Sequence, residues 1–253
     1  MKLSIPRSEL QRGLGRIQAI VEKRNSMPIL ANAFLRASKS DANQLEISAT
    51  DLEVGIRGFH PADVSKAGSL TVSARKLFEV VRELPEEPVQ LASTPNSYLE
   101  IQCGRSRFTL AGTAAEEFPT LPEFSPTAMV KLPAAVVSSL IERTMYAASV
   151  DETRYNLNGV YFELVEDGAK IRMVATDGHR LAMVDRILTA GASDLASGVI
   201  LPRKGLAELK RLVDEDDSDE IELGIEGNSA LVRKGEVTLT MRLIEGEFPN
   251  YRQ

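Results

Sequence analysis

The sequence predicts an α+β protein made of two similar domains, each with two helices packed on curved antiparallel sheets. Three observations support this prediction. Short landmarks recur in the same order at a nearly constant spacing, each half holds two segments with apolar residues at helical spacing, and short strand-like runs fill most of the rest. Because many short strands accompany few helices, we expect helices and strands to be segregated in the manner of α+β folds.

The landmarks indicate a duplication. The tripeptide Ala-Thr-Asp stands at 49–51 and again at 175–177, 126 residues later. Three other landmarks recur at offsets of 127, 128 and 130 residues: Ile5-Pro6 with Leu132-Pro133, Arg75-Lys76 with Arg203-Lys204, and Glu117-Phe118-Pro119 with Glu247-Phe248-Pro249. Roughly 125 residues is a common domain size. We therefore expect one domain at 1–122 and a second at 127–247, joined by a proline-rich linker.

The first half contains two helical patterns, at 7–24 and 74–84, where apolar residues recur three and four positions apart. Gly13 and Gly15 lie inside the first pattern and weaken that helix. The third glycine of a dinucleotide-binding motif is absent, so the pair does not indicate a nucleotide site. Strand-like runs accompany these helices at about 2–6, 33–37, 45–50, 53–59, 69–73, 88–93, 97–102 and 106–111.

The second half repeats this plan, with helical patterns at 133–147 and 203–213. Between two of its strand-like runs, Asp177-Gly178 predicts a two-residue type I′ hairpin, because glycine tolerates the positive φ that this turn requires. The strand-like runs lie at about 129–132, 157–164, 170–176, 180–188, 198–201, 220–225, 229–233 and 236–243.

The net charge of −6 argues against general affinity for nucleic acid, but the charge is unevenly distributed. The four predicted helices carry 13 Lys and Arg against 6 Asp and Glu. Arg75 and Arg82 share the face opposite the apolar stripe, and Lys204 and Arg211 repeat this pair 129 residues later. Lys and Arg are also good helix formers, so composition alone allows either a solvated face or a surface for a polyanion. Recurrence in both halves favours the polyanion.

The residues needed for most enzyme classes are missing. The chain has two histidines and no HxxxH, CxxC, P-loop or GxSxG motif, so we expect neither catalysis nor a cofactor. One alternative is a metal-dependent hydrolase that uses Asp177 and His179, with Asp51 as a further group. Six acidic residues within 214–220 could hold a metal but are more typical of a solvated turn.

The start of the chain has no apolar secretory region, and no run approaches the roughly 20 apolar residues of a membrane span. Cys103 is the single cysteine and cannot form an internal disulfide. These features predict a protein of the reducing cytoplasm without a membrane partner.

Nine motifs together resemble one family, the bacterial DNA polymerase III beta subunit, or β sliding clamp, over the whole length of the chain. They are Met27-Pro28-Ile29-Leu30, Ala49-Thr50-Asp51-Leu52-Glu53, Ala74-Arg75-Lys76, Gly104-Arg105-Ser106-Arg107-Phe108, Arg154-Tyr155, Leu157-Asn158-Gly159, Ala175-Thr176-Asp177-Gly178-His179-Arg180-Leu181, Pro202-Arg203-Lys204-Gly205 and Phe248-Pro249-Asn250-Tyr251-Arg252.

The resemblance implies the DNA clamp fold, with three similar domains per chain and a head-to-tail homodimer that forms a ring around duplex DNA. It implies a processivity factor rather than an enzyme, associated with the nucleoid in the cytoplasm. The implied partners are DNA, the DNA polymerase III alpha subunit, the clamp loader and other proteins that carry a clamp-binding motif. The competing non-enzymatic interpretation is a protein-binding scaffold that does not encircle DNA.

The resemblance also implies three sets of site residues. The DNA-proximal residues are Arg24, Arg75, Lys76, Tyr155, Arg203 and Lys204. The residues of a hydrophobic peptide-binding cleft are Arg154, Leu157, Thr176, Gly178, His179, Arg180, Leu181 and Pro249. The residues of the subunit interface are Arg105, Arg107, Phe108 and Leu110.

The sequence departs from the family pattern at three positions. Asn156 stands where a tyrosine is usual, Asp151 stands where a glutamine can occur, and Gln253 stands where an arginine is familiar. The effect of these departures on DNA and peptide binding stays open at this point. In the family pattern, 248–253 begins the linker to a third domain, which this chain does not include.

Overall fold

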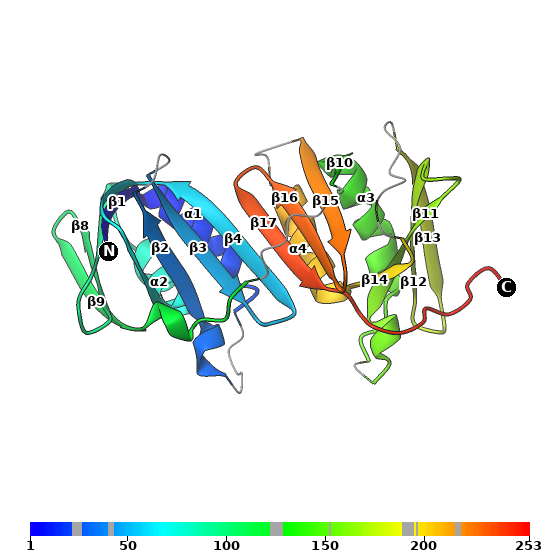
Figure 1. Ribbon diagram of the computed structural model, residues 1–253, viewed down its shortest axis with the longest axis horizontal. Coiled ribbons are helices and arrows are strands. Elements are labelled where there is room, and N and C mark those ends of the chain that lie inside the picture. The colour runs from blue at the N-terminus through cyan, green and yellow to red at the C-terminus, as the bar shows by residue number, and fades with distance from the viewer. Residues whose placement is uncertain are drawn as a thin grey trace. The chain divides into compact units, whose positions relative to one another are not determined.

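The computed structural model describes residues 1–21, 27–39, 43–121, 129–151, 153–188, 195, 197–215 and 219–253. The chain divides into two compact units, Met1–Leu121 and Pro122–Gln253 (Figure 1). Within each unit, α-helices pack on antiparallel strands, which confirms the predicted α+β class. Among the described residues, no helix is long and apolar enough to cross a membrane.

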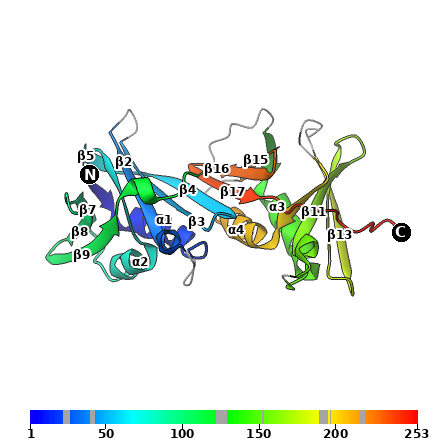
Figure 2. The same ribbon diagram turned by 60° about the horizontal axis from the view of Figure 1, so that its bottom comes forward.

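The first unit contains one extended series of paired strands, in the order β4-β3-β2-β6-β9-β8-β7-β1-β5. Figure 2 shows α1 and α2 side by side along one face of this series. The strands are β1 (Lys2–Pro6), β2 (Asn32–Ser38), β3 (Gln44–Thr50), β4 (Val54–Pro61), β5 (Asp63–Lys66), β6 (Gly68–Ser73), β7 (Pro88–Ser93), β8 (Tyr98–Cys103) and β9 (Ser106–Thr113). The helices are α1 (Arg7–Ile17) and α2 (Ala74–Arg82), with short 3-10 turns η1 (Pro28–Ala31) and η2 (Ala115–Glu117).

The apolar stripe of α1 enters the core as its spacing predicts, with Leu10, Leu14 and Ile17 fully buried. The helix is shorter than the predicted 7–24, because it ends at Ile17 and a tighter turn follows. In that turn the N–H of Ile20 donates to the carbonyl of Ile17 at 3.1 Å, and the Ile20 side chain is buried.

Strand β5 had no counterpart in the sequence prediction. It pairs with β1 through Asp63, Val64 and Lys66, and only Val64 among its four residues is buried. One apolar residue is too few to show the alternation that identifies a strand, so only the pairing partner defines it.

The second unit contains two sheets, in the orders β10-β15-β16-β17 and β13-β12-β11-β14. Helix α3 packs against β12 and β13, and α4 packs against β16 and β17. The strands are β10 (Val130–Pro133), β11 (Gly159–Val165), β12 (Lys170–Thr176), β13 (Leu181–Ile187), β14 (Val199–Pro202), β15 (Glu220–Glu226), β16 (Ser229–Lys234) and β17 (Val237–Arg242). The helices are α3 (Ala134–Thr144) and α4 (Arg203–Val213), with 3-10 turns η3 (Met145–Ala147) and η4 (Tyr155–Leu157).

Helix α4 has the predicted bounds, whereas α3 is α-helical only to Thr144 and continues as η3 to Ala147. A proline is the N-cap residue of three of the described helices: Pro6 for α1, Pro133 for α3 and Pro202 for α4. Its fixed φ suits the end of a strand, and it lacks the N–H that would need a partner there. The repeated apolar-Pro landmark therefore marks a repeated strand-to-helix junction.

Candidate functional site

The loop that follows β12 is built by two polar side chains. The hydroxyl of Thr176 accepts the N–H of Gly178 at 3.1 Å and donates to the carbonyl of Arg180 at 2.7 Å. Oδ1 of Asp177 accepts the N–H groups of His179 and Arg180 at 2.9 and 3.0 Å. The predicted two-residue type I′ hairpin is therefore wrong, since four residues, 177–180, separate the strands and Thr176 faces Leu181. Side chains that satisfy the loop backbone make the longer connection stable.

The same loop occurs after β3 in the first unit. The hydroxyl of Thr50 accepts the N–H of Leu52 and donates to the carbonyl of Val54, both at 3.0 Å. Oδ1 of Asp51 accepts the N–H groups of Glu53 and Val54 at 2.9 and 2.7 Å. Leu52 has a φ of +78° where the second unit has Gly178 at +88°. The Ala-Thr-Asp repeat thus encodes one loop structure used twice.

The carboxylate of Asp177 is committed to this loop. Hydrogen bonds from the backbone N–H groups of His179 and Arg180 hold its pKa below the usual range, and the Arg180 guanidinium adds to the effect. Oδ2 accepts from Nε of Arg180 at 3.0 Å. Among the described residues, no group of three His, Cys, Asp or Glu side chains could hold a metal ion. The hydrolase alternative built on Asp177 and His179 is not supported by this geometry.

The turn at Arg154–Leu157 contacts the 177–180 loop. Nη1 of Arg154 donates to the carbonyl of Asp177 at 3.3 Å. The carbonyl of Leu157 accepts the N–H of Ser149 at 2.9 Å, which ties the turn back to the segment after α3. These bonds bring seven of the eight predicted cleft residues into one surface region: Arg154, Leu157, Thr176, Gly178, His179, Arg180 and Leu181.

The eighth residue, Pro249, lies on the C-terminal segment, Ile244–Gln253, which runs along the second unit after β17 (Figure 1). The side-chain amide of Asn156 donates to the carbonyl of Glu247 at 3.0 Å. Gly246 has a φ of +128°, and a Cβ there would lie 3.4 Å from Cε2 of Tyr155. The C-terminal segment therefore approaches the cleft region through the Tyr155–Asn156 pair.

The cleft residues differ in exposure. Leu181 is 48% exposed, while Thr176 is buried and Leu157 is half-buried. The remaining members, Arg154, Gly178, His179, Arg180 and Pro249, are exposed. Leu181 is thus an exposed apolar side chain beside polar groups whose positions the loop fixes.

Tyr146 belongs to this region, although its sequence position within the predicted helix 133–147 gave no sign of it. Nη2 of Arg180 donates to the carbonyl of Tyr146 at 2.6 Å, and the Arg180 guanidinium lies 5.6 Å from the centre of the Tyr146 ring. The ring is 60% exposed. The pair adds an aromatic surface and fixes the direction of Arg180.

The predicted DNA residues occupy equivalent places in the two units. Arg75 and Lys76 are exposed in the first turn of α2, and Arg203 and Lys204 lie in the first turn of α4, exposed and half-buried respectively. Neither first turn contains an acidic residue. Tyr155 is 61% exposed, and Arg24 lies outside the described residues.

The predicted interface residues lie on or beside β9. From Ser106 to Ala111 this strand pairs with β8 on one side, whereas β6 reaches only Gly112 and Thr113. Within the described part of the chain, the other edge of 106–111 pairs with no named strand. Phe108 is 42% exposed, Arg105 and Arg107 are exposed, and Leu110 is half-buried.

Comparisons with known proteins identify the family. Residues 1–122 match the model of the DNA polymerase III beta subunit N-terminal domain, and residues 131–250 match that of its central domain. The chain is 40% identical over 257 residues to a beta sliding clamp of Caulobacter vibrioides, covering 99% of this chain and 67% of the relative. It is 34% identical over 254 residues to the beta sliding clamp of Escherichia coli, covering 100% of this chain and 67% of the relative.

Solved structures agree. The DNA polymerase sliding clamp from Caulobacter crescentus matches with a TM-score of 0.92 and 38% identity, covering 100% of this chain and 68% of that chain. A sliding clamp from Pseudomonas aeruginosa bound to griselimycin matches with a TM-score of 0.90 and 35% identity, covering 100% and 67%.

The fold of the two units, with helices on antiparallel sheets and a repeated loop and basic helix start, defines a DNA sliding clamp. The chain belongs to the DNA polymerase III beta subunit family, whose members are processivity factors of DNA replication and not catalytic enzymes. The chain spans about 67% of the length of these curated relatives. The scaffold and hydrolase alternatives are not supported by these matches.

Proposed function

We propose that this protein encircles duplex DNA as a head-to-tail ring and contacts the phosphates through basic residues at the starts of α2 and α4. In this proposal, the units at 1–122 and 127–247 act as two clamp domains. The bound polymerase would be the DNA polymerase III alpha subunit, and the clamp loader and other motif-bearing proteins would share the same cleft. The site of action is the nucleoid, in the cytoplasm.

One observation supports the DNA surface above all others. Both units place an Arg-Lys pair in the first turn of their second helix: Arg75-Lys76 in α2 and Arg203-Lys204 in α4. The helix dipole makes this end positive, so each cation there costs helix stability, typically about 0.3–1 kcal/mol. A repeated arrangement that opposes helix stability favours a role outside the helix. The combined positive potential suits an anion such as DNA phosphate.

Phosphate contacts also suit movement along DNA. They carry no sequence information and are nearly the same at every base-pair step, so a ring held by them can slide. Arg75 forms an exposed ion pair with Glu79 at 2.8 Å, and such pairs contribute little to stability. Arg75 can therefore exchange Glu79 for a phosphate at small cost, and enclosure rather than affinity keeps the ring on DNA.

The cleft supports the tethering role. Leu181, Leu157 and Pro249 would form the apolar pocket, and Arg154 and His179 would form its polar rim. The relative from Pseudomonas aeruginosa is described with griselimycin bound, and we propose that the cleft of this chain takes the same ligand in competition with partner peptides.

Ring formation would use the open edge of β9, since an unpaired strand edge beside exposed Phe108 is suited to strand pairing with another subunit.

The DNA surface is tested by loading the protein on primed circular DNA with the clamp loader at increasing salt. The variant replaces Arg75, Lys76, Arg203 and Lys204 by Ala. Its control replaces two exposed arginines on strands, Arg233 and Arg242, by Ala. We expect the helix-start variant to load poorly and to lose most of the salt dependence, because each phosphate contact contributes about 0.9 to the logarithmic salt slope. Normal loading of the helix-start variant would contradict the proposed surface.

A further inference from the structure

Strand β11 presents two outward side chains that the C-terminal segment covers. Val160 and Phe162 enter the core, and Tyr161 and Glu163 alternate with them on the opposite face. Phe248 stacks on Tyr161, with ring centres 5.0 Å apart and planes 14° from parallel. Glu163 is only 8% exposed. The outer face of β11 is thus an attachment surface for the end of the chain.

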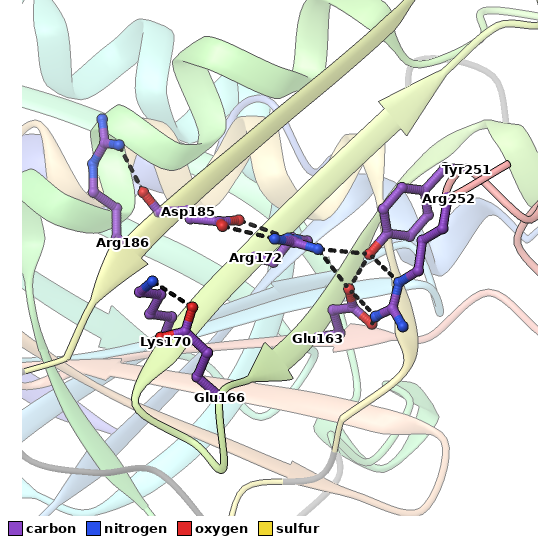
Figure 3. A network of polar contacts seen from close by, with 8 residues as sticks. All are labelled: Glu163, Glu166, Lys170, Arg172, Asp185, Arg186, Tyr251 and Arg252. Carbon is purple, nitrogen blue, oxygen red and sulfur yellow. Dashed lines mark hydrogen bonds and ion pairs between the residues drawn. The ribbon is translucent and has the colours of Figure 1, made fainter.

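Glu163 begins a row of charges across three neighbouring strands. Arg172 on β12 lies directly opposite Glu163, and Asp185 on β13 lies directly opposite Arg172. Arg172 donates two nearly parallel hydrogen bonds to Asp185, at 2.7 and 2.8 Å, and its Nη1 is 3.8 Å from Oε1 of Glu163 (Figure 3). Because Asp185 takes both bonds of the Arg172 fork, Glu163 has acceptor capacity left for another donor.

The C-terminal segment supplies that donor. Nη2 of Arg252 lies 2.9 Å from both carboxylate oxygens of Glu163, and the Tyr251 hydroxyl donates to Oε1 (Figure 3). Nη1 of Arg172 donates to the Tyr251 oxygen at 3.4 Å. Among the described residues, both donors that hydrogen-bond to this buried carboxylate therefore come from the C-terminal segment, and removing them would leave Glu163 with Arg172 alone at 3.8 Å.

The other end of the C-terminal segment is attached as well. The N–H of Ile244 donates to the carbonyl of Ile200 at 3.0 Å, and Asn156 holds the carbonyl of Glu247. Pro249 lies between these attachments and the pair Tyr251–Arg252, and it is exposed. Its position is therefore set by the residues on either side of it.

We propose that Glu163 is a positioning residue of the peptide-binding cleft, which holds Tyr251 and Arg252 and thereby keeps Pro249 where a partner peptide needs it. The inference rests on the proposed function of the cleft. Glu163 is not one of the proposed cleft residues, and it acts on the cleft through the C-terminal segment. Holding the segment in advance spares the peptide the entropy of ordering it, so the attachment raises affinity without a new contact.

The test compares Glu163→Gln with Glu166→Gln in the full protein. Glu166 lies just beyond the same strand and pairs with Lys170, away from the C-terminal segment (Figure 3). Griselimycin is the probe, measured by calorimetric titration, and hydrogen exchange reports the amides of 244–252. We expect Glu163→Gln to bind griselimycin about tenfold more weakly, as if the segment were docked about a tenth of the time. Its amides at 244–252 exchange faster, and Glu166→Gln behaves as the wild type.

Two further variants separate the effect of the charge on Glu163 from the effect of the Tyr251 donor. Glu163→Asp keeps the charge and is expected to recover most of the affinity, and Tyr251→Phe removes one donor without touching β11. Wild-type affinity of Glu163→Gln despite faster exchange would overturn the proposal, as would weakened affinity with unchanged exchange. If Leu181→Ala also leaves griselimycin binding unchanged, the proposed cleft itself fails, which is a different result from failure of the attachment.

Discussion

The hydroxyl of Thr176 donates to the carbonyl oxygen of Arg180 at 2.7 Å and closes the loop that carries most of the proposed cleft residues. Thr50 makes the same bond to Val54 at 3.0 Å in the first unit. Only the second-unit loop adjoins Arg154, whose guanidinium reaches the carbonyl of Asp177. The two units therefore share one loop structure, and the loop of the second unit is the one that we propose as part of a binding surface.

This pair of loops offers a matched test. Thr176→Val and Thr50→Val each remove a buried hydroxyl with two hydrogen bonds and leave loop N–H and carbonyl groups without that partner, at an expected cost of about 1–3 kcal/mol in the free energy of unfolding. Urea denaturation measures this cost. Griselimycin binding should weaken only in Thr176→Val. Equal weakening in Thr50→Val would show that the loop acts through general stability.

Two glycines of α1 should respond oppositely to the same substitution. A Cβ on Gly13 would lie 2.5 Å from Nε2 of His60 and 2.7 Å from Cδ1 of Ile47, so Gly13→Ala should destabilise by about 1–3 kcal/mol. At Gly15 the nearest atom is 3.8 Å away, on Phe78, so Gly15→Ala should stabilise by about 1 kcal/mol. Thermal and urea denaturation check both. Destabilisation by both changes would mean that α1 does not lie as described.

The stability of the first unit should depend on pH through His60, which is 2% exposed. Burial lowers the pKa of His60 below its ordinary 6.5; Glu9 opposes this shift, while Arg16 and Arg12, from the same helix, add to it. The unfolded state binds the proton more readily than the folded state does. The stability that neutral, buried His60 contributes is therefore fully present above pH 6.5 and is lost as the pH falls towards the folded pKa.

The measurement is the free energy of unfolding of the wild type and of His60→Asn at about pH 7.5 and about pH 5.5, which lie on either side of the ordinary histidine pKa of about 6.5. The wild type should lose more stability than the variant on acidification. Nε2 of His60 has no hydrogen-bond partner among the described residues, which adds to the cost of charging the ring there. A parallel loss in both proteins would assign the pH dependence to other groups.

Self-association should depend on Phe108. Phe108→Ala removes an exposed aromatic side chain beside the open edge of β9, and we expect it to weaken association about tenfold, or roughly 1.4 kcal/mol. Sedimentation equilibrium over a range of concentrations measures this. Leu52→Ala is the control, because Leu52 is 53% exposed in the same unit but lies in the loop after β3. A similar effect of both variants would exclude a specific contact at β9.

The sequence by itself determined the elements whose signal is local. The bounds of α4 follow from apolar periodicity that begins after Pro202, and the duplication follows from landmarks such as Ala-Thr-Asp. The family follows from motifs spread along the whole chain. The prediction from sequence missed β5, which has one buried residue. It was also wrong about the Asp177-Gly178 turn, where the hydroxyl of Thr176 and the carboxylate of Asp177 replace the expected hairpin bonds.

Only the tertiary structure decided which charged groups meet. Alternation along β11 places Glu163 on a face, but its position opposite Arg172 depends on the register between two strands. Its contact with Arg252 joins residues 89 positions apart in the sequence. Periodicity tells which side of an element a residue occupies. The contact between Glu163 and Arg252, in contrast, requires the C-terminal segment to pack on the outer face of β11. The attachment of the C-terminal segment that carries Pro249 is therefore visible only in the folded chain.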